Sequence, residues 1–417
     1  MNVFAELGAV VESRWRELNY EQAVFPSIAA QAIAEANIPA VLDPWEIIRW
    51  VHDGDVLPEQ MDLEGGFGNP PITLYVAPRF YIDVYYWLDG TTSIHQHGFS
   101  GAFQVLLGSS VHAQYGFEKH REINPHLLIG RVSLKDVALV ERGDIRQIIP
   151  GPDFIHSLFH LDRPSVTIIV RSFKAPHSGP QYSYLKPFVA RDPFYTNPSL
   201  RRKVQTVELL LRMKHPEADQ FINSLLDSSD FQTTFSVLQS AFDFLCHREL
   251  EEMFGVSRST DRFQKLLERA RARHGELTDL LLPVFEEEWL QRDISRRRSE
   301  IKQEDHRFFL ALLMNVPDRK NLLKLLSQRF PNDDPIKLIV TWTKELAATR
   351  TFGAREPNVL GVTEFNDYHL LVFEKLLRGL STEEICKTAE ANQSQVSIKD
   401  LVAHVQAVPI FKSLFTN

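Results

Sequence analysis

Two histidines one residue apart, His95 and His97, lie in the segment TSIHQHGFSGAFQVLLGS, residues 92–109. The β-branched, aromatic and small residues of this segment are typical of a strand. Side chains two residues apart in a strand point to the same face, so both imidazoles would share one face. Neutral imidazole nitrogens are common ligands of divalent transition metals. The spacing therefore predicts a metal site beside this strand.

A third histidine, His156, lies in GDIRQIIPGPDFIHSLFH, residues 143–160. This stretch predicts a strand, a tight turn at Pro150 and Gly151, and a returning strand that begins with His156. Three rings from two hairpins of a small barrel can converge on one ion and leave positions open for water, oxygen or substrate. His160 shares the face of His156, so it is an alternative ligand or a group that supports one.

These segments resemble the two motifs of the cupin superfamily, whose fold is a small double-stranded β-helix barrel. In that family the first motif carries His-x-His between glycines, and the second carries a glycine, a Pro/Gly turn and a histidine. The matching residues are Gly90, His95, His97 and Gly108 for the first motif, and Gly143, Pro150, Gly151 and His156, at shifted spacings, for the second. The resemblance implies a cupin barrel in this part of the chain.

The carboxylate ligand of the usual cupin site would fall at Gly101 or Ala102, and neither residue can bind a metal. A three-histidine set resembles the cysteine dioxygenase-type thiol dioxygenases, which hold Fe(II) with three histidines and add O2 to a thiol. Residues 79–97, RFYIDVYYWLDGTTSIHQH, are similar to that family's strand with a Trp shortly before Ser-Ile-His-x-His. The similarity spans about residues 70–175.

The late strand SVTIIVRSF departs from that family. Ile169 and Arg171 stand near the positions of the histidine and tyrosine of its Ser-His-Tyr triad, and its cross-linking cysteine is missing. Arg171 could instead bind a substrate carboxylate as a bidentate fork, or form a structural ion pair. Tyr85 is the candidate for a phenol beside bound oxygen, with Tyr75 and Tyr115 as alternatives.

Fe(II) held by three neutral ligands would keep its 2+ charge. It could then bind a thiolate, lower the pKa of a thiol, and bind O2 alongside. We therefore expect a non-haem Fe(II) oxygenase that acts on a small thiol, with Arg171, Tyr85 and His160 as candidate catalytic residues. Mn, Ni and Zn are alternative ions. Two other functions stay open: a metal- or metabolite-sensing cupin without turnover, and a cupin isomerase that uses Mn or Zn.

The other polar residues of this region are not expected to bind the ion. His112, His120 and His126 lie in segments that read as surface or loop. Gln104 has the opposite strand parity to His97, and an amide oxygen is a poor ligand for such an ion. The predicted ligand set therefore contains only the three histidines of the two motifs.

Three regions of different sequence pattern position these residues. Residues 1–70 carry apolar residues at helical spacing, and Asp43 before Pro44 predicts a helix start. Residues 71–195 contain short β-branched and aromatic runs separated by turns, the pattern of a sandwich or barrel. Residues 196–417 show apolar stripes at helical spacing. The fold class is therefore α+β, with a cupin β-barrel between N-terminal helices and a large all-α domain.

Near its end, at residues 371–408, the all-α domain resembles the winged-helix or helix-turn-helix pieces found beside other cupin-type oxygenases. Ser381 and Glu384 predict a capping box there. The recognition stretch at 391–401 has one lysine and no arginine, so we expect no nucleic-acid partner. The basic cluster at 292–302 is interleaved with acids and predicts a solvated helix face. We expect this domain to bind a protein or peptide partner, cap the barrel or form a homodimer.

The composition fits a protein with sizeable cores. The chain has 417 residues, of which 44% are apolar and 11% aromatic, and its formal net charge is -8. A general nucleic-acid binder would be basic. The two cysteines, Cys246 and Cys386, exclude a disulfide framework and fit a reducing compartment. No apolar run reaches the about 20 residues of a membrane span, and the first residues lack a signal-peptide pattern. We therefore expect a cytoplasmic protein without a membrane partner.

Overall fold

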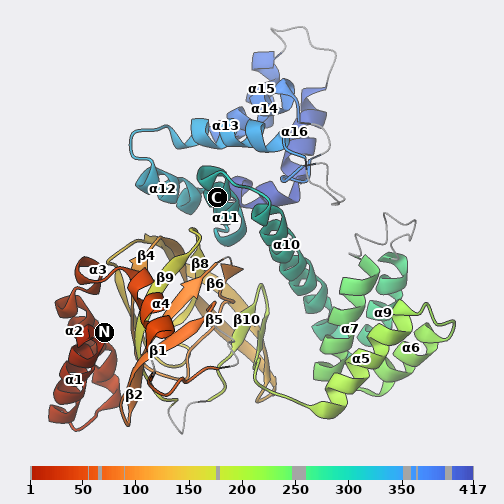
Figure 1. Ribbon diagram of the computed structural model, residues 1–417. Helices are drawn as coiled ribbons and strands as arrows, with labels where there is room; N and C mark the ends of the chain where they lie inside the picture. The colour runs from red at the N-terminus through yellow and green to blue at the C-terminus, as the bar shows by residue number, and fades with distance from the viewer. Residues whose placement is uncertain are drawn as a thin grey trace. The chain divides into compact units, whose positions relative to one another are not determined.

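The computed structural model describes most of the chain (Figure 1). The described residues are 2–54, 56–63, 68–88, 90–174, 179–246, 260–350, 358–362, 365–389 and 397–416. They form two compact units. The first comprises Met1–Phe117 and Ser133–Ser183, and we call it the barrel unit. The second comprises Glu118–Val132 and Tyr184–Asn417, and we call it the helical unit.

Helices precede the strands of the barrel unit. They are α1 (Asn2–Glu17), η1 (Gln22–Val24), α2 (Phe25–Ala36), α3 (Ile38–Val41) and α4 (Pro44–Asp53). The predicted start of α4 is confirmed, because the Asp43 side chain accepts a hydrogen bond from the Trp45 backbone N–H at 3.1 Å. The apolar faces of α1 and α2 meet where the rings of Trp15 and Phe25 lie 4.1 Å apart. These faces form one core with the neighbouring sheet.

The strands form two antiparallel sheets. The five-stranded sheet has the order β1-β2-β9-β4-β7, with β1 (Pro71–Val76), β2 (Phe80–Trp87), β4 (Gly101–Leu107), β7 (Ile145–Ile148) and β9 (Ser165–Ser172). The six-stranded sheet has the order β10-β11-β6-β5-β8-β3, with β3 (Gly90–Thr91), β5 (Ser110–Asn124), β6 (Leu127–Val140), β8 (Ile155–His160), β10 (Ser183–Leu185) and β11 (Val189–Arg191). From β2 to β5, and again from β6 to β9, successive strands alternate between the two sheets, as in a cupin barrel. The expected α+β fold, with helices before and after a cupin-type barrel, is confirmed.

The two faces of the five-stranded sheet differ in composition, because side chains alternate along each strand. Its outer face packs against α1 and α2 through Phe80, Ile82, Val84, Tyr86, Val166, Ile168 and Val170. Its inner face belongs to a second cluster, whose buried members include Tyr85, Phe99, Phe103, Val105, Leu158 and Ile169. Burial of each aliphatic side chain contributes about 1.5–3 kcal/mol. The outer face therefore anchors the N-terminal helices, while the inner face lines the barrel.

The helical unit begins with helices that pack on the end of the β5–β6 hairpin. They are α5 (Pro198–Arg212), α6 (Ala218–Ser228), α7 (Phe231–Cys246), α9 (Thr260–His274), η2 (Gly275–Leu280) and α10 (Leu281–Ser299). Leu127 and Ile129 of β6 share one core with Phe235 and Phe242 of α7. The strand residues in this core explain why the hairpin end belongs to the helical unit.

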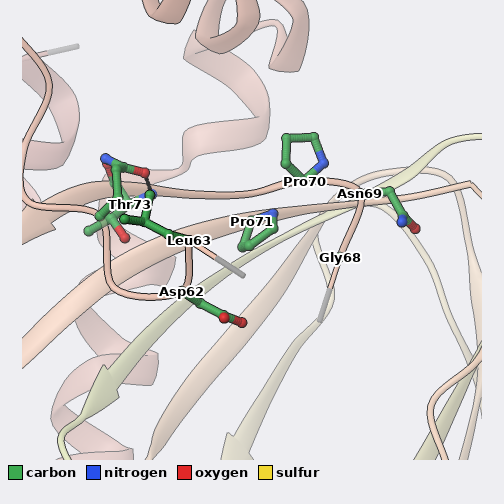
Figure 2. Close-up of a pocket in the computed structure, with 8 residues that line it drawn as sticks. Asp62, Leu63, Gly68, Asn69, Pro70, Pro71 and Thr73 are labelled. Carbon is green, nitrogen blue, oxygen red and sulfur yellow. Dashed lines mark hydrogen bonds between the residues drawn. The ribbon is translucent and has the colours of Figure 1, made fainter. Parts of the chain in front are cut away.

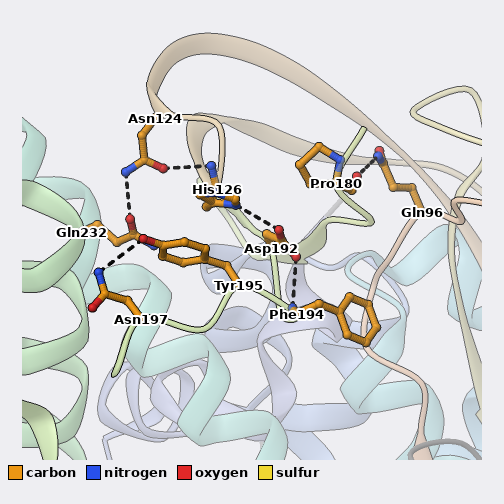
Figure 3. A network of polar contacts seen from close by, with 9 residues as sticks. All are labelled: Gln96, Asn124, His126, Pro180, Asp192, Phe194, Tyr195, Asn197 and Gln232. Carbon is orange, nitrogen blue, oxygen red and sulfur yellow. Dashed lines mark hydrogen bonds and ion pairs between the residues drawn. The ribbon is translucent and has the colours of Figure 1, made fainter. Parts of the chain in front are cut away.

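A polar network joins the hairpin end to α7 (Figure 3). The Asn124 amide donates a hydrogen bond to Gln232 Oε1 at 2.8 Å. His126 Nδ1 lies 3.0 Å from Asp192 Oδ2, and its ring stacks on Tyr195 at 3.8 Å. Part-buried hydrogen bonds of this kind fix one register of the hairpin on the helices.

The rest of the helical unit contains α11 (Glu304–Asn315), α12 (Arg319–Arg329), α13 (Pro335–Ala347), α14 (Asp367–Leu377), α15 (Thr382–Ala389), α16 (Ile398–Ala407), η4 (Pro409–Phe411) and α17 (Lys412–Phe415). The predicted capping box is present, because the Ser381 N–H donates to Glu384 Oε2 at 2.7 Å and the Glu384 N–H donates to Ser381 Oγ at 3.3 Å. Residues 391–396 of the predicted recognition stretch lie outside the described residues. None of the described helices combines the length and apolar character that crossing a membrane requires.

The basic cluster at 292–302 is a solvated helix face only in part: Arg292 and Lys302 are exposed as predicted, but two of its arginines are buried. Arg297 and Arg298 are only 3% and 2% exposed. Arg297 Nη2 lies 2.6 Å from Asp293 Oδ2, and its Nη1 donates to Val359 O at 2.8 Å. A guanidinium with such partners can be buried, and the order of charged residues in the sequence does not reveal those partners.

Candidate metal centre

Three histidine side chains meet inside the barrel unit. His95, His97 and His156 each offer one ring nitrogen, and these nitrogens lie within 4.8 Å of one another. The Nε2 atoms of His97 and His156 are 2.8 Å apart. Two nitrogens bound to one ion at about 2.1 Å lie roughly 3–4 Å apart. The structure therefore brings the three predicted ligands together at nearly the spacing of one shared ion.

Backbone hydrogen bonds place these rings. The N–H of His95 donates to His156 O and the N–H of His156 donates to His95 O, both at 2.9 Å. The carbonyl of His97 accepts from the Gly151 N–H at 2.8 Å. These contacts are isolated bridges, and the continuous strand β4 begins only at Gly101. The strand predicted over residues 92–109 is therefore shorter than expected, because its first part bends to point the rings inward.

The outer nitrogens of two rings have hydrogen-bond partners. His95 Nδ1 lies 2.6 Å from Ser93 O, so Nδ1 carries the ring proton and Nε2 keeps the lone pair that an ion needs. His156 Nδ1 lies 3.1 Å from His112 Nε2. A partner on the outer nitrogen of a ligating histidine fixes the orientation of its ring. Both rings are therefore oriented before any ion binds.

His112 is a residue of this site that sequence reasoning missed. It was expected at the surface or in a loop, but it lies on β5 and is only 3% exposed. Its contact with His156 makes it a support for a ligand. The signal was the run SSVHAQYGF, residues 109–117, which contains no Asp, Glu, Lys or Arg. A strand without charged residues is typically buried on both faces.

Burial keeps the ligand rings neutral. Desolvation lowers the pKa of His95, and it lowers the pKa values of His97 and His156 well below their ordinary value. Repulsion between the rings adds to this effect, and the positive charge of Arg171 lowers the pKa of His97 further. The neutral imidazole is the form that binds a divalent cation. The three residues fit a resident transition-metal ion at neutral pH.

The backbone excludes an acidic ligand at the usual cupin position. Gly101 lies on the inner face of β4, where a Cβ atom would come within 2.1 Å of Val170 O. Ala102 points to the outer face and packs in the core with the N-terminal helices. Among the described residues, no aspartate or glutamate joins the histidine cluster. The absence of a carboxylate ligand is therefore a property of the strand packing.

Arg171 lies on the inner face of β9. Its guanidinium carbon lies 3.5 Å from the ring centroid of Phe99 and 5.1 Å from that of Tyr81. Its Nε atom is buried without a hydrogen-bond partner in the described part of the chain. The side chain is thus a cation packed on aromatic rings near His97. Among the described residues no carboxylate forms a close ion pair with it, although its charge opposes part of the rise that burial causes in the pKa of Asp83.

The three candidate tyrosines lie in different places. The Tyr85 hydroxyl donates to Asp83 Oδ2 at 3.1 Å on the inner face of β2, and burial raises its pKa. Tyr75 packs on Phe80, 5.9 Å between ring centroids, toward the N-terminal helices. Tyr115 has the opposite strand parity to His112. Tyr85 is therefore the candidate that shares the inner wall with the cluster.

His160 does not join the histidine cluster. Its ring stacks on Trp87 at 4.4 Å, and its Nδ1 atom lies 3.0 Å from Ser110 Oγ and 2.8 Å from Ser165 Oγ. Its Nε2 atom is buried and has no partner in the described part of the chain. Burial lowers the pKa of this ring to about 3. His160 is therefore a buried, neutral polar group outside the histidine cluster, and not one of its members.

A separate pocket of about 490 Å³ opens where β1 begins (Figure 2). Asp62, Asn69 and Thr73 are among its lining residues. None of the three clustered histidines lines it. The candidate metal centre is thus distinct from this pocket.

Comparison with known proteins finds only partial likeness to solved structures. No protein-family model matches the chain, and no curated protein matches it. Solved structures with partial similarity include the capsular polysaccharide assembling protein CapF from Staphylococcus aureus, at 19% identity over 27% of this chain and 29% of that chain, with a TM-score of 0.20. This chain thus spans under a third of the length of CapF.

Two further solved structures match about a quarter of the chain. One is hydroquinone 1,2-dioxygenase from Sphingomonas sp. TTNP3 with 4-hydroxybenzoate bound, at 11% identity over 26% of this chain and 68% of that chain, with a TM-score of 0.20. The other is a cupin 2 conserved barrel domain protein from Rhodopseudomonas palustris. It is 15% identical over 28% of this chain and 69% of that chain, with a TM-score of 0.18. Scores this low carry no argument about activity, so the cupin-type fold of this chain rests on its own strand order.

Proposed function

We propose that the barrel unit binds Fe(II) and adds O2 to a small thiol. The observation that carries this proposal is the set of three buried, neutral imidazoles with no carboxylate ligand among the described residues. Bound Fe(II) would supply electrons to O2 and a full 2+ charge that favours a thiolate over a thiol. The overall reaction, RSH + O2 giving RSO2H, adds both oxygen atoms to sulfur and needs no external reductant.

The inner wall supports binding of an anionic group beside the thiol. Arg171 would bind a substrate carboxylate through its guanidinium fork, because its Nε has no hydrogen-bond partner in the described part of the chain. Stacking on Phe99 restricts the plane of that fork. His160, with an unpartnered and buried Nε2, would contact the part of the substrate remote from the sulfur. Tyr85 would border the same space through its hydroxyl group.

Metal analysis tests the site directly. Protein purified without oxygen should carry about one iron per chain, and His97→Ala should reduce metal content by about tenfold or more, because a third of the ligand set is lost. His120→Ala is the matched control, because that side chain is 53% exposed on β5. Equal metal content in wild type and His97→Ala would contradict the site.

Oxygen uptake separates the proposed reaction from its alternatives. Iron together with thiol-dependent O2 consumption supports the oxygenase. A bound ligand without O2 consumption instead indicates a metabolite-sensing cupin, and zinc or manganese with activity that does not require O2 indicates an isomerase. Mass spectrometry of the product should show a gain of two oxygen atoms.

A further inference from the structure

Asp83 is a buried carboxylate on the inner wall whose hydrogen bonding is incomplete. Only 2% of this residue is exposed. Its Oδ2 atom accepts a hydrogen bond from the Tyr85 hydroxyl at 3.1 Å. Its Oδ1 atom is buried and has no hydrogen-bond partner in the described part of the chain. A buried carboxylate oxygen without a donor is costly, so a ligand that brings a donor to it would bind favourably.

Asp83 and Arg171 are diagonal neighbours on one face. In the β2–β9 register Asp83 pairs with Ile169, and Arg171 pairs with Tyr81. Diagonal neighbours in an antiparallel pair are about 7–8 Å apart at the backbone, within reach of long side chains. Among the described residues, however, no ion pair joins Asp83 to Arg171. Burial raises the pKa of Asp83 above its ordinary value, and the positive charge of Arg171 opposes part of that rise. The wall therefore presents an anion and a cation side by side, each with a buried polar atom that has no partner.

The other charges near Asp83 do not complete it. Asp62 raises the pKa of Asp83, and a hydrogen bond from the Thr73 hydroxyl to the carboxylate lowers it. Thr73 Oγ1 also accepts a hydrogen bond from the Met61 N–H at 3.1 Å. No lysine or other arginine contributes to the pKa shift of Asp83. Thr73 and Tyr85 thus donate to the carboxylate, but Oδ1 itself has no donor in the described part of the chain, so a ligand or water could supply one.

We propose that Asp83 is a specificity-determining residue. Its Oδ1 atom accepts a hydrogen bond from an ammonium or N–H group of the ligand, while Arg171 binds the ligand's carboxylate. The proposal rests on the proposed function in one respect, which is that Arg171 binds a carboxylate beside the metal centre. A ligand with a carboxylate alone would leave Oδ1 without a donor and would be repelled by its charge.

Calorimetric binding without oxygen tests this with two ligands that differ at one position. L-cysteine and 3-mercaptopropionate share the thiol and the carboxylate, and only the first carries an ammonium group. Wild type should bind L-cysteine at least tenfold more tightly, because a hydrogen bond between charged groups is worth about that factor or more. Asp83→Asn removes the charge at constant shape. It should weaken L-cysteine binding about tenfold and strengthen 3-mercaptopropionate binding severalfold.

Asp53→Asn is the matched control, because Asp53 is an exposed acid at the end of α4 and its loss should leave both affinities unchanged. A wild type that binds 3-mercaptopropionate as tightly as L-cysteine, or that binds neither at millimolar concentration, overturns the proposal. The comparison of the two ligands on the wild-type protein needs no variant, so it tests the proposal even if Asp83→Asn fails to fold. An affinity ratio unchanged by Asp83→Asn overturns it too.

Failure of this inference and failure of the proposed function give different results. Discrimination that depends on Asp83, without any consumption of O2, supports the role of Asp83 and contradicts the oxygenase. If the protein consumes O2 but Asp83→Asn does not change the ratio of the two ligand affinities, the result supports the oxygenase and contradicts the role of Asp83.

Discussion

The outer and inner faces of the five-stranded sheet are formed by the same strands but differ in the side chains that they present. On β2 the outer residues Phe80, Ile82 and Val84 are fully buried against the N-terminal helices. The inner residues Asp83 and Tyr85 are also buried, but they are polar. On β2 the two faces therefore differ in polarity, and the inner face includes a carboxylate oxygen of Asp83 without a hydrogen-bond partner in the described part of the chain.

The outer face contributes mainly to the stability of the fold, and the inner face presents the polar groups that could bind a ligand. Apolar groups on the outer face gain free energy from burial with no hydrogen bond to satisfy. On the inner wall, atoms of Asp83, Arg171, His97 and His160 are buried without hydrogen-bond partners in the described part of the chain. Such groups cost stability, and they cluster where a ligand or ion could complete them. The comparison predicts large losses of stability from the outer face and smaller ones from the inner.

The largest effect should come from the outer face. Phe80→Ala removes a fully buried ring that lies 5.9 Å from Phe25 and 6.5 Å from Trp15, between centroids. The expected loss is about 3–5 kcal/mol in the free energy of unfolding, because the cavity cannot collapse between packed helices and strands. Urea unfolding followed by circular dichroism measures it.

Phe173→Ala is the control for that substitution. Phe173 follows the end of β9 and is 39% exposed, so its loss should cost less than about 1.5 kcal/mol. Equal losses from the two substitutions would contradict the assignment of the outer face as the stabilising core.

An intermediate effect should come from His160 and should depend on pH. Its folded pKa is about 3, below the ordinary value of 6.5, so between these values the unfolded chain binds a proton that the folded chain does not. Stability is therefore complete above pH 6.5 and falls as the pH drops below it. At pH 5 this ring alone should cost about 2 kcal/mol relative to pH 7.5.

His160→Gln tests that dependence. The other buried histidines add a slope of the same sign, so the quantity to compare is the change in unfolding midpoint between pH 7.5 and pH 5.0 in wild type and variant. The variant should lose less stability over this range. A variant as sensitive to acid as wild type would show that His160 is not a buried neutral ring.

The smallest effect should come from Thr167, which accepts a hydrogen bond from the Trp87 indole N–H at 3.0 Å. Thr167→Val keeps the shape and removes the acceptor, so the expected loss is about 1 kcal/mol. The Trp87 ring stacks on His160, and a shift in tryptophan fluorescence should accompany the loss. Val105→Ala at its register partner leaves this hydrogen bond in place and should leave the fluorescence closer to that of wild type.

The sequence predicted the fold and the histidine cluster because the two motifs that contain the three histidines have recognisable local spacings. The His-x-His pair, the turn at Pro150 and Gly151, and the Asp43 cap each act within a few residues. The exclusion of a carboxylate could be predicted from Gly101, although its cause could not, since it is a contact with the Val170 carbonyl on another strand.

What sequence reasoning missed depends on partners that are distant along the chain. His112 supports His156 across 44 residues, and Arg297 is buried because it reaches the carbonyl of Val359, 62 residues away. Asp83 was not singled out, because its significance lies in the diagonal position of Arg171 on a neighbouring strand. The residue type alone does not reveal such a partner, because histidine, arginine and aspartate also occur on protein surfaces.

The contact between Gly101 and the Val170 carbonyl also limits how this barrel could evolve. A single substitution cannot convert the site to a mixed nitrogen and oxygen donor set here, because any side chain at this position would first have to separate two paired strands. New chemistry would have to be acquired through the groups around the ion or through the small molecule that binds it. At Gly101 the packing of the main chain, rather than the choice of side chain, therefore excludes a carboxylate ligand.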